Sequence, residues 1–197
     1  YFPLFLGRSV SEILEDEWEK LGRLMARVHN VGERKLCRVR PSLNTQHLNG
    51  WPALDEIEKF MDPSLASRYL GAAEEILHQY DENVDESSFF RIHGDLHKGN
   101  LLERDGQFFL VDFDDHVSGP AIQDVWMLFP DLQDFENEKN LFLKGYEDLR
   151  AFPDEQWQWI PLLRGLRLIG YSAWIARRWK DPSFPKLFPD FGSFGYW

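Results

Sequence analysis

The chain has 197 residues, of which 43% are hydrophobic, 22 are Lys or Arg and 33 are Asp or Glu, so its net charge is -11. The apolar fraction is too high for a disordered chain and predicts a globular fold with a sizeable core. The acidic excess argues against nucleic acid as a partner. No apolar run reaches the roughly 18 residues of a membrane span, so no membrane partner is expected. The single cysteine forms no intrachain disulfide, which favours a cytoplasmic protein.

Helical spacing of apolar residues dominates the chain outside its middle. The first predicted helix covers 9–30, with Ser9 or Ser11 as its N-cap and Gly32 as its stop. Asp62 and Pro63 are typical of a helix start and predict a second helix that runs to about residue 85. The later predicted helices are 121–129, one that uses apolar positions between 135 and 149, and a last long helix that begins near Pro161 and extends through Ala176.

Short apolar runs predict a small β element in the middle of the chain. Residues 89–92 are expected to form a strand, and 101–103 and 108–111 a hairpin closed by Asp105 and Gly106. Residues 31–62 are expected to be a long connection with one short helix. The tail, 181–197, interleaves Pro with Phe and predicts an irregular strap over apolar surface. The predicted fold class is therefore α+β, mainly α, as one helical domain with a small β insert.

Polar residues gather in two segments beside these strands. Residues 93–100 read His-Gly-Asp-Leu-His-Lys-Gly-Asn, and residues 112–115 read Asp-Phe-Asp-Asp. Buried carboxylates are costly unless they are paired or bound to a metal, so a cation is expected there. Phosphoryl transfer needs a carboxylate near the attacking hydroxyl and oxygen ligands for magnesium. The spacing predicts Asp95 as the group that accepts or orients the hydroxyl proton, and Asn100 and Asp112 as the magnesium ligands.

Four neighbouring residues receive secondary predictions. Asp114 is expected to be a further metal contact. His97 and Lys98 either approach the phosphates, where a cation offsets developing charge, or face solvent. His93 belongs to the catalytic loop and is interpreted as a packed, hydrogen-bonded histidine more than as a proton carrier.

A metal-dependent hydrolase is the main alternative from the residues alone. Imidazole and carboxylate ligands suit zinc, iron or manganese. The candidate ligands are His93, Asp95, His97, Asp112 and His116. Asn100 and the later Asp124-x-Trp126 pattern favour a kinase over this hydrolase.

The two polar segments and residues 119–126, Gly-Pro-Ala-Ile-Gln-Asp-Val-Trp, resemble the aminoglycoside phosphotransferase and choline kinase superfamily. Its fold is protein-kinase-like, and within it the chain is similar to the bacterial stress response kinase A group. The resemblance implies ATP and Mg2+ as cofactors. It implies a Ser or Thr of a protein as acceptor in that group, and aminoglycosides, choline, homoserine or similar small alcohols in the wider superfamily. It also implies that Asp124 hydrogen-bonds the backbone of the catalytic loop.

The chain departs from a complete kinase because no glycine-rich loop and no strand lysine precede residue 93. It therefore resembles a C-terminal lobe. Residues 1–8 are expected to be a hinge remnant from a missing N-terminal lobe, and 181–197 the strap. Residues 9–180 are expected to form the helical lobe, with the catalytic loop and metal-binding hairpin at 88–115. Such a lobe is expected to be inactive alone, and a pseudokinase or binding module is the remaining alternative.

Overall fold

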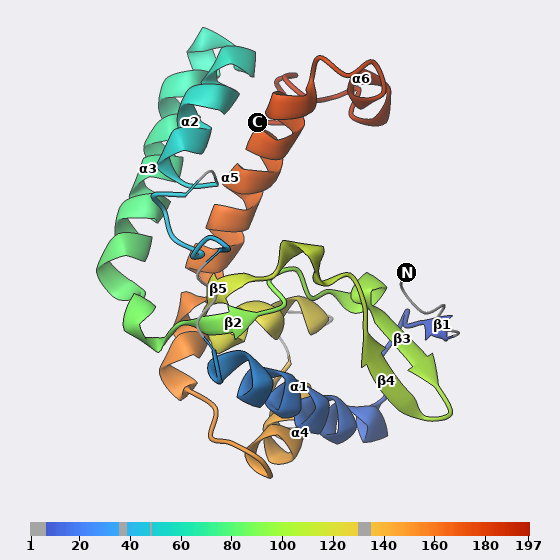
Figure 1. Cartoon of the computed structure of the whole chain (residues 1–197). Helices are drawn as coiled ribbons and strands as arrows, with labels where there is room; N and C mark the ends of the chain where they lie inside the picture. The colour runs from blue at the N-terminus through green and yellow to red at the C-terminus, as the bar shows by residue number, and fades with distance from the viewer. Residues whose placement is uncertain (1–6, 36–38, 48, 130–134) are drawn as a thin grey trace. The chain divides into compact units, whose positions relative to one another are not determined.

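The structure is a computed structural model that describes residues 7–35, 39–47, 49–129 and 135–197. These residues form two compact units (Figure 1). The first unit takes its residues from 1–42 and 86–157, and the second from 43–85 and 158–197. Cys37 and most of the expected hinge, residues 1–6, lie outside the described residues.

The first unit combines two helices with two small antiparallel sheets. Strands β1, β3 and β4 form one sheet in the order β1-β3-β4, and β2 pairs with β5 in the other. Leu101 lies opposite Leu110 in the β3–β4 hairpin, and Phe90 lies opposite Gly119 in the β2–β5 pair. The elements are α1 (Trp18–Glu33), α4 (Glu136–Glu147), β1 (Arg8–Ser9), β2 (Phe90–Ile92), β3 (Leu101–Arg104), β4 (Gln107–Leu110) and β5 (Val117–Gly119).

Helices α1 and α4 lie side by side and form much of the first unit's core (Figure 1). The helix axes approach closely because each helix presents a glycine to the other. A Cβ added to Gly22 would stand 2.1 Å from the carbonyl oxygen of Phe142, and one added to Gly145 would stand 2.0 Å from that of Glu19. No side chain larger than hydrogen fits at either position without moving a helix backbone.

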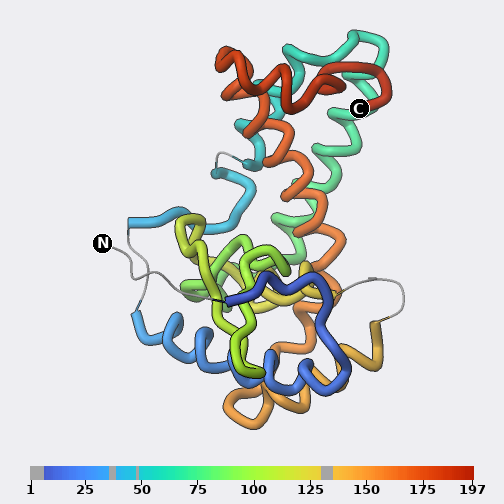
Figure 2. Tube along the Cα trace, turned by 90° about the vertical axis from the view of Figure 1, so that its right-hand side faces the viewer, coloured from blue at the N-terminus to red at the C-terminus, as the bar shows by residue number. Residues whose placement is uncertain are grey.

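The second unit is helical. Helices α3 and α5 run side by side (Figures 1 and 2), and α2 packs against both. Asp62 caps α3 by accepting a hydrogen bond from the backbone N–H of Ser64 at 2.8 Å. The helices are α2 (Trp51–Ile57), α3 (Pro63–Asn83), α5 (Ile160–Arg178) and α6 (Phe184–Leu187). Across the described residues, no helix is both long and apolar enough to cross a membrane.

Several predicted elements are confirmed. Helix α3 begins at Pro63 behind the Asp62 cap, and α5 begins beside Pro161. The hairpin turn is where it was predicted, with φ of 54° at Asp105 and 73° at Gly106, as a two-residue turn of this kind requires. The mainly helical fold with a small β element is the one expected from the sequence.

The predicted start and stop of the first helix are wrong. Arg8 and Ser9 pair with β3, so the helix does not begin at Ser9. Residues 15–17 form a 3-10 turn that the Glu17 carboxylate closes by accepting from the N–H of Leu14 at 2.8 Å, and α1 follows at Trp18. Helix α1 then passes through Gly32, where a Cβ would stand 2.0 Å from the carbonyl oxygen of Arg91. Gly32 is therefore needed for close packing and does not end the helix.

Two further predictions need correction. Residues 121–129 form two 3-10 turns, Ala121–Asp124 and Trp126–Leu128, instead of an α-helix. Backbone N–H groups here bond to the carbonyl three residues earlier, from Gln123 to Pro120 at 3.1 Å and from Val125 to Ile122 at 3.0 Å. The tail is not wholly irregular, because it contains the short helix α6. Phe188, Phe191 and Trp197 pack on aromatic residues of the second unit, and the Trp197 indole donates to the carbonyl of Phe60 at 3.3 Å, whereas Phe194 is 75% exposed.

Two single glycine-to-alanine substitutions test the contact between α1 and α4. Gly22→Ala should destabilise the chain by about 1–3 kcal/mol or more, because the new methyl group collides with backbone. Gly71→Ala is the matched control, since a Cβ at this position of α3 meets nothing within 4 Å. It should stabilise the chain by about 0.4–1 kcal/mol. Urea unfolding measures both, and equal effects would contradict the close approach.

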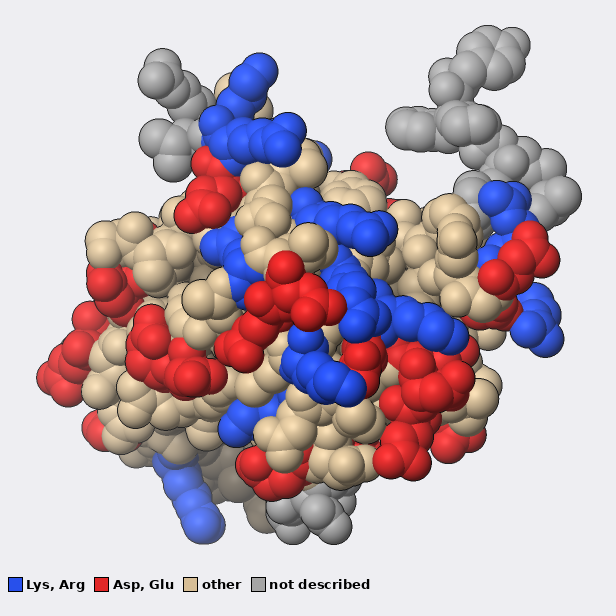
Figure 3. All heavy atoms as spheres, turned by 90° about the horizontal axis from the view of Figure 1, so that it is seen from below, with Lys and Arg blue, Asp and Glu red and all other residues tan. Residues whose placement is uncertain are grey.

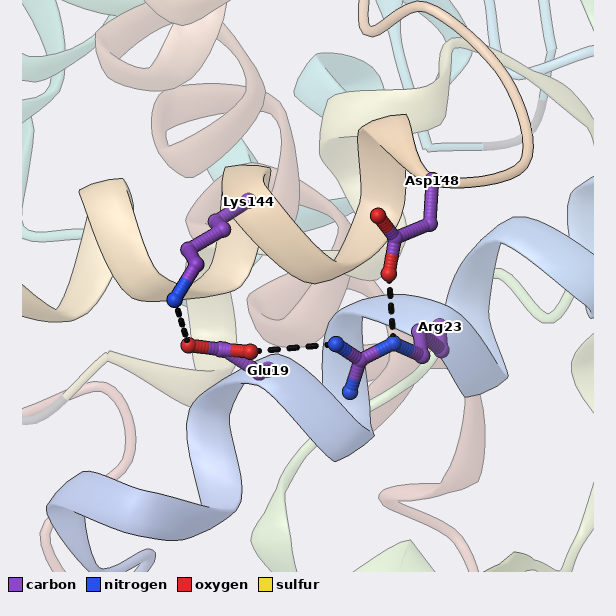
Figure 4. Close-up of polar contacts among 4 residues, drawn as sticks. All are labelled: Glu19, Arg23, Lys144 and Asp148. Atoms are coloured by element: carbon purple, nitrogen blue, oxygen red, sulfur yellow. Dashed lines mark hydrogen bonds and ion pairs between the residues drawn. The ribbon is translucent and has the colours of Figure 1, made fainter.

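Charged side chains also connect α1 to α4 (Figure 4). Lys144 lies 2.5 Å from one oxygen of Glu19, and Arg23 lies 3.0 Å from the other. Arg23 also donates to Asp148 at 2.6 Å. The hydrogen bond from Lys144 lowers the pKa of Glu19 below its ordinary value of 4.5, against the opposing effect of desolvation.

The lowered pKa of Glu19 predicts a pH dependence of stability. The stabilisation from ionised Glu19 should be present above its ordinary pKa and lost as the pH falls through the lower folded-state pKa. Glu19→Gln should therefore cost stability in urea unfolding at pH 6 and cost less at pH 3, and added salt should reduce the difference. Glu12→Gln, at an exposed residue, is the control. A Glu19→Gln effect that is the same at both pH values would contradict the ion pairs.

Candidate active site

The loop that follows β2 is folded against the segment that follows β4. Gly94 has a φ of 88°, in the left-handed region that favours glycine. A Cβ at this position would also stand 2.6 Å from the carbonyl oxygen of Asp115. Gly94 therefore permits both the turn of the loop and its close contact with residues 112–115, so the two polar segments singled out in the sequence lie together.

Asp124 holds the backbone of this loop. Its side chain is fully buried, and its two oxygens accept hydrogen bonds from the backbone N–H groups of His93 and Gly94, each at 2.7 Å. Gln123 donates its side-chain amide to the carbonyl of Gly94 at 2.9 Å. Hydrogen bonds to an ionised acceptor are stronger than neutral ones. Both polar backbone groups of Gly94 are thus bonded to side chains of the Ala121–Asp124 turn.

The β3–β4 hairpin brings Asn100 beside the segment that contains Asp112. The N–H of Val111 donates to the carbonyl of Asn100 at 3.1 Å, which continues the register of the hairpin by one residue. Asn100 is 8% exposed, and its side-chain amide donates to the carbonyl of Asp95 at 2.8 Å. This hydrogen bond fixes the amide so that its nitrogen faces the loop and its oxygen is available to a ligand.

Asp112 has an unusual backbone. Its φ and ψ are both 62°, a left-handed conformation that costs about 1–3 kcal/mol in residues other than glycine and is concentrated at functional sites. A 3-10 turn follows at Phe113–Asp115, and its two acidic residues are exposed. Asp112 itself is exposed as well. The Asp112 and Asp114 carboxylates therefore both retain access to solvent, on the segment that packs against the loop.

His93 is a packed residue. It is fully buried, and its Nε2 donates to the carbonyl of Val111 at 2.8 Å. The ring of Phe113 lies 4.6 Å from the ring of His93, centroid to centroid. These contacts connect the loop to the end of β4 and leave His93 away from solvent.

His97 lies beside Asp95. Its Nε2 is 3.7 Å from a carboxylate oxygen of Asp95, and its Nδ1 accepts from the N–H of Gly99 at 3.0 Å. The side chains of Asp95 and His97 are 26% and 43% exposed, so both are within reach of a ligand. Lys98 is half-buried at the start of the 3-10 turn Lys98–Asn100.

Two buried residues were missed by the sequence reasoning. His29, from α1, is fully buried, and its Nδ1 is 2.8 Å from the hydroxyl oxygen of Tyr146 in α4. Its Nε2 lies 3.4 Å from the same Asp124 oxygen that accepts from His93. Burial raises the pKa of the Tyr146 hydroxyl. In the sequence, His29 and Tyr146 are marked only by their places in amphipathic helices.

The side chains fit a magnesium ion better than a metal held by protein alone. Among the described residues, no group of three or more His, Cys, Asp or Glu side chains is placed to hold a metal. The five candidate ligands of the hydrolase alternative are all described residues, so they do not form such a group. Asn100 and Asp112 offer an amide oxygen and a carboxylate. Mg2+ commonly takes one or two such protein ligands and completes its shell with phosphate and water oxygens. This donor set therefore suits an ion that arrives with a nucleotide.

The fold is of the kinase-like type, and the loop carries the residue pattern that predicted it. The chain belongs to the phosphotransferase enzyme family, whose match covers residues 4–160. The predicted superfamily and the kinase-like fold are confirmed.

Relatives of known name extend this result. The chain is 36% identical to "Stress response kinase A" of Escherichia coli O157:H7 over 199 residues. It is 34% identical over 200 residues to "Serine/threonine protein kinase RdoA" of Salmonella typhimurium. Both matches cover 100% of this chain and 60% of the relative. The chain therefore spans about three fifths of the length of these proteins.

Solved structures show the same fold at lower identity. Amicoumacin kinase hAmiN matches with a TM-score of 0.67 at 20% identity, over 96% of this chain and 61% of that one. The microcompartment-associated aminopropanol kinase matches with a TM-score of 0.63 at 20% identity, over 96% and 63%.

The Asp124 contacts predict a large cost for a small chemical change. Asp124→Asn replaces one of two accepting oxygens by an NH2 group that faces an N–H donor. The free energy of unfolding should fall by about 1.5–3 kcal/mol. Asp105→Asn makes the same change at an exposed turn where asparagine tolerates the left-handed backbone, and should stay within about 0.5 kcal/mol of wild type. Urea unfolding distinguishes the two, and equal losses would contradict the buried anchor.

Proposed function

We propose that this chain is the catalytic lobe of an ATP-dependent phosphotransferase that moves the γ-phosphoryl group to a hydroxyl. The observation that carries the proposal is the hydrogen bond from the N–H of Val111 to the carbonyl of Asn100. It joins the two polar segments at the end of the hairpin, with Asn100 on one side and Asp112 on the other. Phosphoryl transfer depends mainly on such positioning of ligands and charge.

Each site residue has a distinct proposed role. Asp95 orients the acceptor hydroxyl and accepts its proton, which its partly exposed carboxylate permits. Asn100 and Asp112 hold the metal through the amide oxygen and the carboxylate, with Asp114 as a further contact. Mg2+ bound there supplies neutralisation of the charge on the nucleotide phosphates.

The neighbouring residues support these roles. Lys98 is proposed to approach the phosphates, and His97 to hold the Asp95 carboxylate in place, since its Nε2 lies 3.7 Å away. His93 and Asp124 are positioning residues. Asp124 fixes the loop through the two N–H groups, and His93 connects the loop to β4.

A Ser or Thr hydroxyl of a protein is the proposed acceptor. It is supported by the relative called a serine/threonine protein kinase, which is 34% identical over the whole of this chain. The amicoumacin kinase structure is a complex with AMP-PNP and Ca2+, which supports use of a nucleotide and a divalent ion in this fold. A cytoplasmic location, where ATP is abundant, is proposed for this chemistry.

The activity is proposed for a protein of the relatives' length, because this chain spans 60% of them. The residues that would cover the nucleotide on its second side are expected in the part of such a protein that this chain does not include. Assays should therefore use the product of the whole reading frame that encodes this chain.

Substitutions in the two polar segments test the mechanism. Asp95→Asn should lower kcat by about a hundredfold or more, with little change in the KM for ATP, because it removes the proton acceptor. Asp112→Ala should also lower kcat and should raise the Mg2+ concentration needed for half-maximal rate. Asp105→Asn is the control and should leave both constants unchanged. Transfer of 32P from γ-labelled ATP to a mixture of Ser/Thr peptides is the measurement.

The same assay separates the alternatives. Transfer that survives both substitutions would contradict the assignment of Asp95 and Asp112. Transfer to small alcohols but not to peptides would contradict the protein acceptor and favour a small-molecule kinase. Nucleotide binding without any transfer would contradict catalysis and favour a binding module.

A further inference from the structure

A pocket lies in the first unit beside the C-terminal half of α1, and the proposed reaction does not use it. Its volume is about 480 Å3, within the range of roughly 300–1,000 Å3 typical of small-molecule sites. Val28 and Val31 line it from α1, Ile92 from the end of β2, and Phe113 from the segment after Asp112. The pocket therefore offers a mainly apolar lining.

Two arginines lie in the same lining. Arg27 is exposed and Arg91 is half-buried. Arg91 donates to the carbonyl of Val31 at 3.4 Å, and neither guanidinium forms an ion pair with any residue that the structure describes. The chain as a whole carries a net charge of -11, so two unpaired cations beside one apolar pocket are a local exception.

The surrounding surface carries both signs of charge. Figure 3 shows the side of the molecule on which α1 and α4 lie in Figure 1, with Lys and Arg in a band across its middle and Asp and Glu beside and between them. Along α1, Lys20 lies 3.9 Å from Asp16, and Arg23 is paired with Glu19 and Asp148. Arg27, one turn further along the same face, is the cation of this row that lines the pocket.

We propose that this pocket binds an amphipathic organic anion. Its apolar body is buried against Val28, Val31, Ile92 and Phe113, and its carboxylate or phosphate head is bound by Arg27 and Arg91. A guanidinium presents two parallel N–H groups to such a head, which fixes its orientation. Burial of the apolar body supplies most of the affinity, and the arginines select for negative charge.

The pocket shares residues with the catalytic loop. His93 lines it, as does Phe113, whose ring lies 4.6 Å from that of His93. His93 in turn donates to the carbonyl of Val111, directly before Asp112. A bound anion that shifts Phe113 would therefore change the position of Asp112. This effect on transfer depends on the proposed function, whereas binding itself does not.

Decanoate, below its micelle concentration, is a suitable probe for the product of the whole reading frame that encodes this chain. Methyl NMR signals of Val28, Val31 and Ile92 should shift and saturate with added decanoate. Decanol has the same tail without the charge, and acetate has the same head without the tail. Each should bind at least about tenfold more weakly, as expected when one charge-assisted contact or the apolar burial is lost. Equal binding of decanol would overturn the selection for an anion, and unchanged methyl signals would overturn the site.

Matched variants locate the head and the tail. Arg27→Ala and Arg91→Ala should each weaken decanoate binding by about tenfold, as expected for one charge-assisted hydrogen bond. Lys20→Ala removes the same charge from α1 outside the pocket and should leave binding within about twofold of wild type. Val31→Asp should weaken binding, and Val39→Asp should not, although both side chains are exposed, at 52% and 93%.

Two further outcomes would overturn the proposal. An effect of Lys20→Ala equal to that of Arg27→Ala would show only general attraction to a cationic face. Sedimentation that shows a dimer dissociated by decanoate would show that the pocket is covered by a second copy of the chain. Binding that persists when Asp95→Asn has abolished transfer would support the pocket independently of the catalytic assignment.

Discussion

The buried carboxylate of Asp124 is the interaction on which the candidate site depends. An ionised carboxylate is costly to bury unless its oxygens are hydrogen-bonded, and here both oxygens accept from N–H groups of the loop after β2. The loop is held in return, because the N–H groups of His93 and Gly94 have Asp124 as their partner. His29 adds a polar contact from α1, and Tyr146 fixes the imidazole from α4. The close packing of α1 on α4, which Gly22 and Gly145 permit, therefore sets the positions of His29 and Tyr146 beside Asp124.

The hairpin carries the second half of the geometry. Because β3 and β4 are antiparallel, the residue before β3 lies next to the residue after β4. The hydrogen bond from Val111 to Asn100 joins these two residues and extends the pairing beyond the strands. The left-handed Asp112 then turns the chain away from the sheet, and Phe113 packs on His93. Local strain at Asp112 is offset by these contacts. The carboxylates of this segment retain access to solvent, where a cation with its own phosphate ligands can reach them.

Local signals in the sequence predicted the elements that local physics determines. The Asp62 cap is a contact within two residues, and the Asp105–Gly106 turn needs only a backbone that accepts positive φ. A helix start at Ser9 is excluded by the pairing of Arg8 and Ser9 with β3, nearly a hundred residues later, which periodicity does not report. The motif likewise indicated Asp95, Asn100 and Asp112, whereas His29 and Tyr146 are 117 positions apart and carry no shared pattern. Family membership confirmed the predicted superfamily and left the roles of single residues as predictions.

The central claim is that Asn100 and Asp112 hold the metal that accompanies the nucleotide. Paramagnetic broadening by Mn2+ tests this most directly, because Mn2+ replaces Mg2+ at oxygen sites and broadens NMR signals of nearby nuclei. With ATP and substoichiometric Mn2+ added to the product of the whole reading frame, we predict that the side-chain amide of Asn100 and the backbone amides of Asp112 and Asp114 broaden first. Excess Mg2+ should restore them. If these signals stay sharp while signals of other residues broaden, the metal site and the proposed mechanism are contradicted.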